Sequence, residues 1–384
     1  MKKTIIYFLS IVLTTLLCCG CEDNSSGKYP YDTIRFYVDN NVPIKHPTQV
    51  INATSWGDWN AELYPMEVWI EETDIATVDN RGYVTGHKIG TFTLHAKVMG
   101  KHGLIEDSKQ FTVSDALTYL TINQIWELQA LGVDKNNDEI ITASELEQTE
   151  FFTEPIYSNF LLSLAQYLPN LKEVSVIADT TQSRTLDLSM FKLKKLQITD
   201  ICAQYAKNEN YPNVIDDVMH QKYQPYFLTS LVLNNTIEHL IVGYLPGFDI
   251  LDLSQYSNLK YFQQIALEGT RNWKEINYIL PVQISKLNMH LGGLQYSDML
   301  PNLSTIEAYE PLNVVLNKQY IPNLKSLKCK KYWLSSSITS LDISTYSEGD
   351  LNDIFIDVDT LYLSQSFADN IDRYAIFADN IIIK

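Results

Sequence analysis

Hydrophobic and polar residues are arranged in three different ways along the chain, and each arrangement predicts its own kind of element. Residues 30–114 carry short alternating runs separated by turn residues, with Phe92 and Leu94 in the clearest run, which predicts an all-β domain. Residues 115–150 place apolar positions at helical spacing on both sides of a polar loop, which predicts a short helix-loop-helix. In residues 151–384 a Leu-x-x-Leu-x-Leu pattern recurs about every 20 residues, which is typical of stacked repeats.

The first 20 residues read as an export signal, with Lys2 and Lys3 before an apolar run that is too short to span a membrane. The run ends in Leu17-Cys-Cys-Gly-Cys21, which resembles a bacterial lipobox. The resemblance implies that residues 1–20 are removed, that Cys21 is lipidated, and that residues 21–29 form a tether. The alternative is an ordinary secretory signal with a free Cys21.

Glu22 and Asp23 directly follow the cysteine, which resembles the surface-export signal of Bacteroidetes lipoproteins. That resemblance implies an outer-membrane, lipid-anchored protein facing the cell exterior. The formal net charge of −17 disfavours nucleic acid as a partner, because phosphate binding needs basic patches. Outside the signal and anchor only Cys202 and Cys329 remain, and we expect two buried free thiols.

The segment Asp74–Val98 reads IATVDNRGYVTGHKIGTFTLHAKV after its first residue and resembles the group 2 bacterial immunoglobulin-like domain. The resemblance implies a β-sandwich over residues 30–114. Asn80 and Gly82 are expected to form a turn within it. Two exposed tryptophans would give a platform for sugar, but packing at the sandwich edge is the alternative use for Trp56 and Trp59.

Two capping-box patterns, Thr121 with Gln124 and Thr142 with Glu145, predict the helix starts on either side of the polar loop. The twelve residues 134–145 resemble an EF-hand calcium loop, also found in dockerin-like modules. A hard cation needs several oxygens at fixed spacing, and the resemblance implies these ligands: Asp134, Asn136, Asp138, Ile140 through its carbonyl, Thr142 and Glu145. Glu139 replaces the usual glycine of the sixth position, which predicts weak Ca²⁺ affinity, and the alternative is a calcium-free linker over residues 115–150.

The repeat pattern resembles leucine-rich repeats, which implies an α/β solenoid over residues 151–384 with one short parallel strand in each unit. Fuller units begin at Leu171, Leu193, Leu303 and Leu324, and Leu-Asp-Leu-Ser stands at 186–189 and 251–254. Residues 203–226 interrupt the period, and the asparagine-ladder position is expected to be mostly absent. A helix over Ser158–Tyr167 suits the N-terminal cap, and residues 380–384 predict a final strand.

The residues between the leucines are expected to face outward and to bind partners: Lys172, Glu173, Ser175, Lys194, Lys195, Gln197, Ser304, Thr305, Glu307, Lys325, Ser326 and Lys328. An ordinary solvated sheet is the alternative. The order of lipobox, immunoglobulin-like domain, EF-hand-like loop and repeats resembles multidomain surface lipoproteins of gut Bacteroidetes. It implies a non-catalytic role in adhesion or protein recognition.

No catalytic motif is found, since the seven histidines lack metal-binding spacing and no G-x-S-x-G occurs; we therefore expect no enzyme. Asp216, Asp217 and His220 form a local cluster that is more typical of a polar surface. The main alternative function is glycan binding within a polysaccharide-uptake system, which the 24 tyrosines and 6 tryptophans would allow. A plain structural spacer is the third interpretation.

Overall fold

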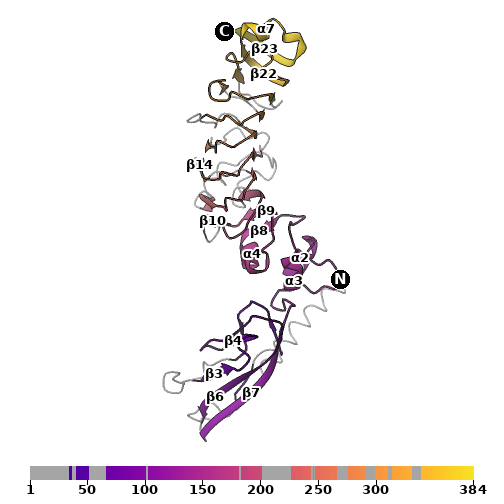
Figure 1. Cartoon of the computed structure of the whole chain (residues 1–384), viewed down its shortest axis with the longest axis vertical. Helices are drawn as coiled ribbons and strands as arrows, with labels where there is room; N and C mark the ends of the chain where they lie inside the picture. The colour runs from indigo at the N-terminus through magenta and orange to yellow at the C-terminus, as the bar shows by residue number, and fades with distance from the viewer. Residues whose placement is uncertain are drawn as a thin grey trace, which may run out of the picture. The chain divides into compact units, whose positions relative to one another are not determined.

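The computed structural model describes residues 34–36, 40–51, 66–100, 103–180, 183–200, 226–243, 245, 247–265, 276–290, 299–309, 314–330 and 339–384. The chain divides into two compact units, Met1–Thr118 and Tyr119–Lys384. Helices and strands carry the labels of Figure 1.

The first unit consists of two small sheets around one apolar core. A four-stranded sheet has the order β1-β7-β6-β3, and a three-stranded sheet has the order β2-β5-β4. Their bounds are β1 (Asn41–Pro43), β2 (Thr48–Gln49), β3 (Glu67–Ile70), β4 (Ala76–Val78), β5 (Tyr83–Gly86), β6 (Gly90–Gly100) and β7 (Gly103–Ser114). The predicted alternation on β6 is confirmed, because Phe92, Leu94, Ala96 and Val98 are all buried.

The predicted turn at residues 80–82 is also present between β4 and β5. The Asp79 carboxylate accepts hydrogen bonds from the backbone N–H groups of Arg81 and Tyr83, each at 2.9 Å. Gly82 has φ +83°, and a Cβ there would lie 2.3 Å from the backbone oxygen of Ile51. Only glycine fits this turn without strain.

The second unit opens with two short helices, α2 (Ile122–Ala130) and α3 (Ala143–Glu147). Both predicted capping boxes are confirmed, with Thr121 capping α2 and Thr142 capping α3. A small apolar cluster is buried along the helices and the loop that joins them: Leu128, Leu131, Val133, Ile141 and Leu146.

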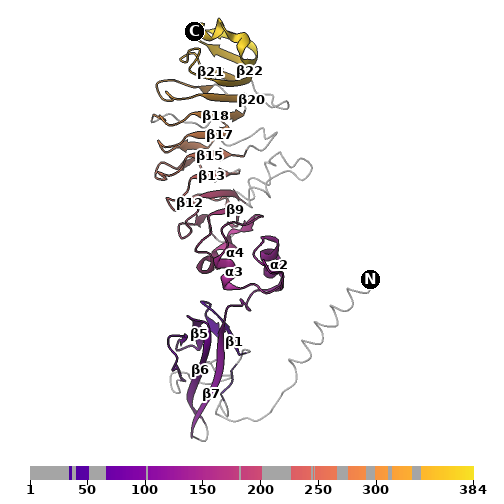
Figure 2. The ribbon, with the colours of Figure 1, turned by 45° about the vertical axis from the view of Figure 1, so that its right-hand side comes forward.

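A β-solenoid follows, and its chain alternates between a large parallel sheet and a second set of short parallel strands (Figures 1 and 2). The strands of the large sheet are β8 (Ile156–Tyr157), β9 (Glu173–Ala178), β11 (Lys195–Asp200), β13 (His239–Val242), β15 (Tyr261–Gln264), β17 (Lys286–His290), β18 (Thr305–Tyr309), β20 (Ser326–Lys330), β22 (Asp353–Leu363) and β23 (Ala375–Ile383). The second set comprises β10 (Thr185–Asp187), β12 (Ser230–Val232), β14 (Ile250–Asp252), β16 (Asn277–Ile279), β19 (Val314–Val315) and β21 (Ser340–Asp342), of which β19 and β21 are joined to the large sheet by the pairing of β21 with β22.

The leucines of the repeat point into the space between the two sets of strands. Leu193, Leu196 and Ile198 are almost fully buried, as are their counterparts in the other coils. Cys329 occupies one such position and is buried as a free thiol, as expected. Burial raises the pKa of this thiol, because the charged thiolate loses its hydration there.

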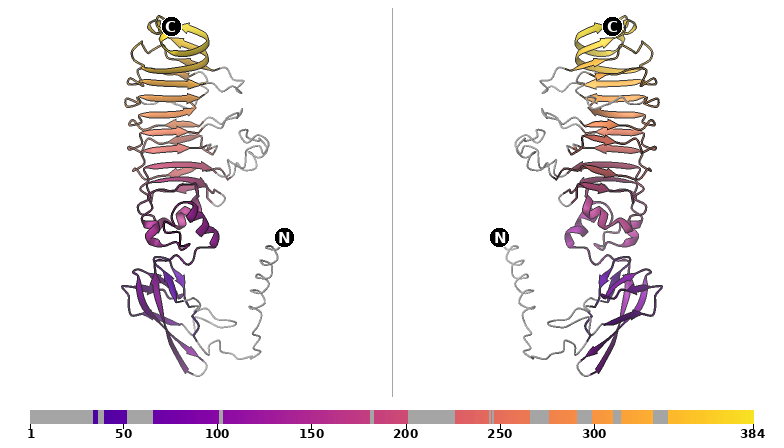
Figure 3. Two further views of the ribbon diagram at one scale, coloured as in Figure 1. Left: turned by 90° about the vertical axis from the view of Figure 1, so that its right-hand side faces the viewer. Right: turned by 90° about the vertical axis from the view of Figure 1, so that its left-hand side faces the viewer.

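The coils stack through a repeated backbone contact, and Figure 3 shows the strands of the large sheet lying one above another. One carbonyl in each coil accepts hydrogen bonds from two successive N–H groups of the next coil. For example, Lys194 and Lys195 donate to the Lys172 oxygen at 2.8 and 3.1 Å. The series of acceptors runs through Glu150, Lys172, Lys194, Glu238, Lys260, Ser285, Ser304 and Lys325. A structural period therefore exists even where the spacing in sequence is irregular.

The predicted fold class is wrong. Helices make up only 12% of the structure, so the repeats do not form an α/β leucine-rich-repeat solenoid. Among the described residues between β9 and β22, no α-helix connects two strands of the large sheet. Three return segments, on β10, β14 and β21, are Leu-Asp-Leu-Ser or Leu-Asp-Ile-Ser motifs whose apolar residues alternate with polar ones, and that period of two favours a strand over a helix.

The aspartate of each Leu-Asp-Leu-Ser motif ends its short strand. The Oδ1 atoms of Asp187, Asp252 and Asp342 accept the backbone N–H two residues onward, each at 2.9 Å. Such a side-chain turn offers the backbone an alternative to a helical hydrogen bond. It explains why the motif recurs on strands β10, β14 and β21.

Both ends of the repeat domain follow the sequence prediction. The predicted helix over Ser158–Tyr167 is confirmed as α4 (Ser158–Ser163) followed by the 3₁₀ helix η1 (Ala165–Tyr167), and α4 contacts β8 and β9. At the other end β22 turns from one set of strands to the other and pairs with β20, β21 and β23. The helix α7 (Gln365–Ala368) and the 3₁₀ helix η4 (Ile371–Arg373) connect β22 to β23.

Candidate functional site: the outward face of the large sheet

Parallel pairing in register aligns the outward side chains of the large sheet into rows. The inward Leu196 of β11 lies opposite Val174 of β9 and Leu240 of β13. The next residue, Gln197, points outward and lies opposite Ser175 of β9 and Ile241 of β13. The same register continues through β15, β17, β18, β20 and β22. We call this surface the outward face and define it by four positions in each of eight successive coils: 172, 173, 175, 177; 194, 195, 197, 199; 238, 239, 241, 243; 260, 261, 263, 265; 285, 286, 288, 290; 304, 305, 307, 309; 325, 326, 328, 330; and 352, 353, 355, 357.

All twelve residues predicted to point outward lie on this face and are exposed or half-buried. The three middle coils were missed as repeat units at the sequence level. Their buried positions include Ile237, Phe262 and Ile284 in place of leucine. A pattern that admits any large apolar residue would have found the coils at 237 and 284, but the coil at 259 has the polar Gln264 at a buried position.

Oppositely charged side chains on neighbouring coils pair across the outward face. The Nζ atom of Lys195 lies 3.4 Å from a Glu173 oxygen, and that of Lys328 lies 3.1 Å from an Asp353 oxygen. Glu238 lies between two lysines of adjacent coils, Lys194 at 2.8 Å and Lys260 at 3.8 Å. These pairs are solvent-exposed, so each is expected to contribute only about 0 to 1 kcal/mol to stability.

The pairing lowers the pKa of two carboxyls on the face. The hydrogen bond from Lys194 is the main cause for Glu238, and the charge of Lys260 adds to it. For Asp353 the main cause is Lys328, followed by a hydrogen bond from the Ser326 hydroxyl. Both carboxylates are therefore ionised at neutral pH, and the face carries fixed charges of both signs.

Lysines cover the aromatic rings on the outward face. The Nζ atom of Lys286 lies 5.5 Å from the centre of the Tyr261 ring, and that of Lys330 lies 5.4 Å from the centre of the Phe355 ring. His239 packs beside Tyr261 with ring centres 5.5 Å apart. Such cation–π contacts hold the ammonium groups close to the sheet.

Asn288 is the most buried polar side chain of the face, with 7% exposure. Its Nδ2 atom donates to Glu307 Oε2 at 3.2 Å, whereas its Oδ1 atom has no hydrogen-bond partner. A buried acceptor without a partner costs stability. Asn288 therefore offers a fixed acceptor to an N–H or O–H group.

A different set of contacts fixes the corners that lead into the large sheet. The repeats contain an asparagine ladder, formed by the asparagine of Pro-Asn-Leu or its equivalent. Each Nδ2 atom donates to a backbone carbonyl of the preceding coil: Asn170 to Glu147 at 2.8 Å, Asn258 to Asn235 at 2.7 Å, Asn302 to Val282 at 3.1 Å and Asn323 to Pro301 at 2.8 Å. The prediction that the ladder position of leucine-rich repeats is mostly absent concerns a different position, and this second ladder was not predicted, although Pro-Asn-Leu recurs in the sequence.

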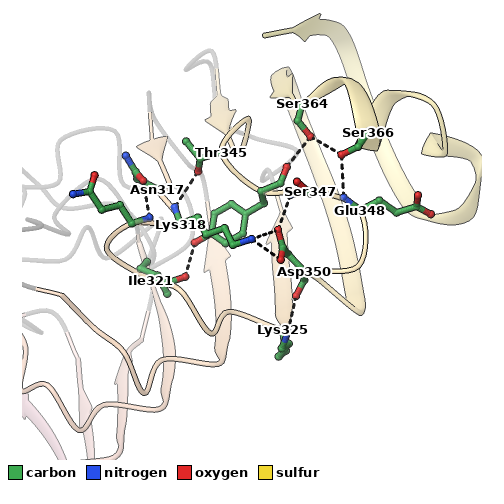
Figure 4. Close-up of polar contacts among 12 residues, drawn as sticks. Asn317, Lys318, Ile321, Lys325, Thr345, Ser347, Glu348, Asp350, Ser364 and Ser366 are labelled. Carbon is green, nitrogen blue, oxygen red and sulfur yellow. Dashed lines mark hydrogen bonds and ion pairs between the residues drawn. The ribbon is translucent and has the colours of Figure 1, made fainter.

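A polar staple ties the last coils together (Figure 4), and it consists of Lys318, Asp350 and the groups bonded to them. The Nζ atom of Lys318 contacts both carboxylate oxygens of Asp350 at 2.7 Å, and the N–H of Ser347 donates to the same carboxylate at 2.7 Å. The backbone N–H of Lys318 donates to the Thr345 hydroxyl at 2.9 Å. Partial burial opposes ionisation of Asp350, but Lys318 and Ser347 outweigh it and lower its pKa.

The loop between α2 and α3 brings the first calcium-ligand candidates together. Asp134 is 7% exposed; its Oδ2 atom accepts from Gln129 at 2.9 Å and from the Glu139 N–H at 3.1 Å, and its Oδ1 atom has no partner. The hydrogen bond from Gln129 is the main cause that lowers the pKa of Asp134. Asn136 bonds to Asp138, with Nδ2 donating to a carboxylate oxygen at 2.9 Å.

The remaining candidates fit a cation less fully. Glu145 Oε2 accepts from Thr142 N–H and Oγ1 at 3.0 and 2.8 Å, so this oxygen serves the capping box. The side chain of Ile140, proposed to ligate through its carbonyl, is exposed. Within the described ranges, no three His, Cys, Asp or Glu side chains converge on a common point. The buried Oδ1 atom of Asp134, which has no hydrogen-bond partner, is thus the main feature that fits a cation.

Several residues considered at the sequence level lie outside the described residues. They are the lipidation candidate Cys21, the aromatic pair Trp56 and Trp59, Cys202, and the cluster Asp216, Asp217 and His220. In the part of the chain that the structure describes, no helix is long and apolar enough to cross a membrane.

Comparisons with known proteins give little to interpret. No protein-family model and no curated protein matches the chain. One solved structure, a Bacteroides fragilis NCTC 9343 protein provisionally assigned as an alpha-galactosidase, shares 11% identity over 65% of this chain and has a TM-score of 0.17. This chain spans about half of that structure's length, with 52% covered. The family resemblances drawn from the sequence stay predictions.

Proposed function

We propose that this protein is a non-catalytic, lipid-anchored surface protein that recognises another protein through the outward face. The observation that carries the proposal is the alignment of exposed side chains into continuous rows by parallel pairing in register. Loops usually carry binding residues because a rigid scaffold positions them. Here the scaffold itself presents the side chains, and stacking fixes their spacing.

The dimensions of the outward face favour a macromolecular ligand. Eight successive strands from β9 to β22 contribute to it, and neighbouring strands lie about 4.8 Å apart, so it extends over roughly 34 Å. A typical protein–protein interface takes about 20 to 30 residues from each partner. The face provides that number of outward positions on one rigid surface.

Glycan binding is the weaker alternative. Sugars stack on exposed aromatic faces, but Lys286 and Lys330 already lie over the rings of Tyr261 and Phe355. A glycan would have to displace both ammonium groups to reach these rings. The mixture of charged, amide and apolar side chains on the face is closer to a protein-binding surface.

The cell-surface location rests on the lipobox-like segment that ends at Cys21 and on the acidic pair that follows it. Lipidation at Cys21 would supply several acyl chains, and more than one chain is needed for stable anchoring. Mass spectrometry of the mature protein tests this part: the expected N-terminus is an acylated Cys21. An unmodified Cys21 in the processed protein would refute the proposed lipid anchor.

We also infer that the 134–145 loop binds Ca²⁺ with an affinity on the order of 0.1–1 mM, typical of extracellular modules. The support is the buried Oδ1 atom of Asp134, which has no partner. Glu139 has φ +63°, a left-handed conformation that favours glycine, so the loop bears strain at this residue. This strain is expected to lower both the stability of the loop and its calcium affinity.

Calorimetric titration tests the calcium site. One weak binding event is expected for the natural chain, and Asp134→Ala should abolish it. Glu139→Gly should raise both the melting temperature and the calcium affinity, because glycine adopts this conformation without strain. A flat titration up to several millimolar would refute calcium binding and leave the loop as a linker.

Site-specific photo-crosslinking in the native cell tests the recognition surface. A crosslinking amino acid at Gln197 or Gln263, on the outward face, should trap a discrete protein partner. The matched control sites are Thr185 and Ile250, exposed positions on the short strands, which should trap none. Equal crosslinking at both sets, or none at either, would contradict the proposal.

A further inference from the structure

We infer that the partner recognised by the outward face is an acidic polypeptide. This inference rests on the proposed function and names the chemistry of its ligand. It starts from a charge asymmetry. The outward face is net positive, although the chain as a whole carries −17.

Counting the charged residues of the face gives eight lysines and five carboxylates, hence a net charge of +3. The remainder of the chain therefore carries −20, the difference between −17 and +3. The lysines are Lys172, Lys194, Lys195, Lys260, Lys286, Lys325, Lys328 and Lys330, and the carboxylates are Glu173, Glu238, Glu307, Asp353 and Asp357. A local field of opposite sign to the net charge steers a complementary partner to one surface.

Ion pairs within the outward face neutralise only part of the charge of its lysines. Glu238 is shared between Lys194 and Lys260, which leaves a net positive charge in these coils. Lys330 is held over an aromatic ring, a contact that leaves its charge uncompensated. Lys325 donates to the backbone oxygen of Asp350 at 3.3 Å, and its charge also lowers the pKa of the Asp350 carboxyl, so this lysine has an acidic neighbour outside the face.

Exposure of the ammonium groups makes them available to a partner. The side chains of Lys194 and Lys260 are 58% and 61% exposed, and that of Lys195 is 49% exposed. Lys195 begins β11, Lys194 directly precedes it, and Lys260 directly precedes β15; β13 lies between these two strands. The three ammonium groups form one exposed cluster around Glu238 and its neighbours.

Apolar outward side chains favour an acidic polypeptide over an acidic polysaccharide. Ile177, Ile241 and Ile265 lie half-buried in the same rows as the lysines. Aliphatic groups of this kind contact apolar side chains of a protein partner, whereas a uronic acid polymer offers mainly hydroxyl and carboxylate groups.

Binding of fluorescent poly-L-glutamate to the full-length protein in neutral detergent tests the inference. A chain of net charge −17 should repel this polyanion unless a positive surface captures it. We expect binding at low salt that weakens steeply as salt screens the charges. Polygalacturonate of equal charge is the polysaccharide probe and should bind less tightly.

Two triple variants with the same change in net charge locate the surface. Lys194→Gln, Lys195→Gln and Lys260→Gln together should weaken poly-L-glutamate binding at least tenfold. The control triple, Lys45→Gln, Lys88→Gln and Lys135→Gln, removes three exposed lysines outside the face and should change binding less than twofold. Circular dichroism and melting curves establish that both variants fold.

Three results would overturn the inference: absence of poly-L-glutamate binding at low salt, equal losses in the two triple variants, or tighter binding of polygalacturonate. None of them contradicts the proposed recognition function, because photo-crosslinking at Gln197 tests that function without assuming the charge of the partner. Conversely, failure of crosslinking with intact poly-L-glutamate binding would show a basic surface that has no protein partner in the cell.

Discussion

The outward face and the corners of the solenoid belong to the same coils but are held in different ways. On the face, long charged side chains such as Lys195 and Glu173 pair with each other across neighbouring strands in water. At the corners, short side chains such as Asn323 bond to backbone carbonyls of the preceding coil. The first kind of contact is worth little to folding, whereas the second satisfies backbone groups that each coil must pair.

This difference separates the residues that maintain the fold from those free to serve recognition. The buried leucines, the corner asparagines and the aspartates of Leu-Asp-Leu-Ser define the coil. The outward side chains depend on that coil, but the coil depends little on them. A scaffold of this type tolerates change on one surface without loss of stability.

The largest expected contrast is between two adjacent residues of β11. Leu196→Ala removes a fully buried side chain and should cost about 2 to 5 kcal/mol of unfolding free energy. Gln197→Ala changes a half-buried outward side chain and should stay within about 0.5 kcal/mol. Urea denaturation of both variants measures the contrast, and equal losses would mean that the face also maintains the fold.

The polar staple should give the next largest effect. Asp350→Ala leaves the Lys318 ammonium and the Ser347 N–H without their acceptor, and should cost about 1 to 3 kcal/mol. Asp372→Ala is a matched control, because Asp372 is exposed. Hydrogen exchange should locate the loss in β21 and β22; a similar loss in the control would contradict a specific role of the staple.

Acid should release the same staple. The pKa of Asp350 is lowered in the folded chain, so its stabilising contribution is complete above the ordinary aspartate pKa of about 3.9 and disappears as the pH falls through the lower folded value. Melting curves of the natural chain and of Asp350→Asn should therefore converge below about pH 4. A constant difference between them from pH 7 to pH 2 would contradict this assignment.

A single rung of the asparagine ladder is expected to contribute less. Asn323→Ala removes one hydrogen bond to the Pro301 carbonyl and should cost about 1 kcal/mol. Asn352→Ala, at an exposed position beside β22, serves as the control and should cost less than about 0.5 kcal/mol. The urea midpoints of the two variants are compared. Equal midpoints would mean that the asparagine ladder does not contribute to stability.

The smallest expected effect lies on the outward face. Lys286→Gln breaks the 3.6 Å pair with Glu307 and the contact over Tyr261, yet it should change the unfolding free energy by about 0 to 1 kcal/mol. High salt should reduce the difference further because it screens exposed charges. A loss of unfolding free energy as large as that of Leu196→Ala would mean that the outward face stabilises the fold as much as the core does.

Sequence patterns predicted four strands of the large sheet (β9, β11, β18 and β20), the outward positions of those coils and the two capped helices, because these follow from local periodicity and from side chains within four residues of each other. They failed on the return segments. Leu186 and Leu188 alternate over only a few residues, and the resemblance to leucine-rich repeats implied an α/β solenoid in place of strands. The role of Asp187 as a turn residue depends on the strand that ends there.

The candidate site was predictable in part for the same reason. Outward positions such as Gln197 follow from the repeat pattern, but cross-coil pairs such as Lys194 with Glu238 join residues 44 positions apart. Their proximity depends on a coil that accommodates residues 201–225, and no local rule specifies it. The net charge of the face likewise becomes visible only after eight coils are stacked in register.

Measuring the affinity of the partner trapped from Gln197 tests the central claim most directly. Its binding to the natural chain is compared with binding to the double variant Gln197→Glu and Gln263→Glu, alongside the melting temperatures of both proteins. The account predicts an affinity at least tenfold weaker with a melting temperature almost unchanged. Unchanged affinity, or a loss that accompanies unfolding, would contradict recognition through the outward face.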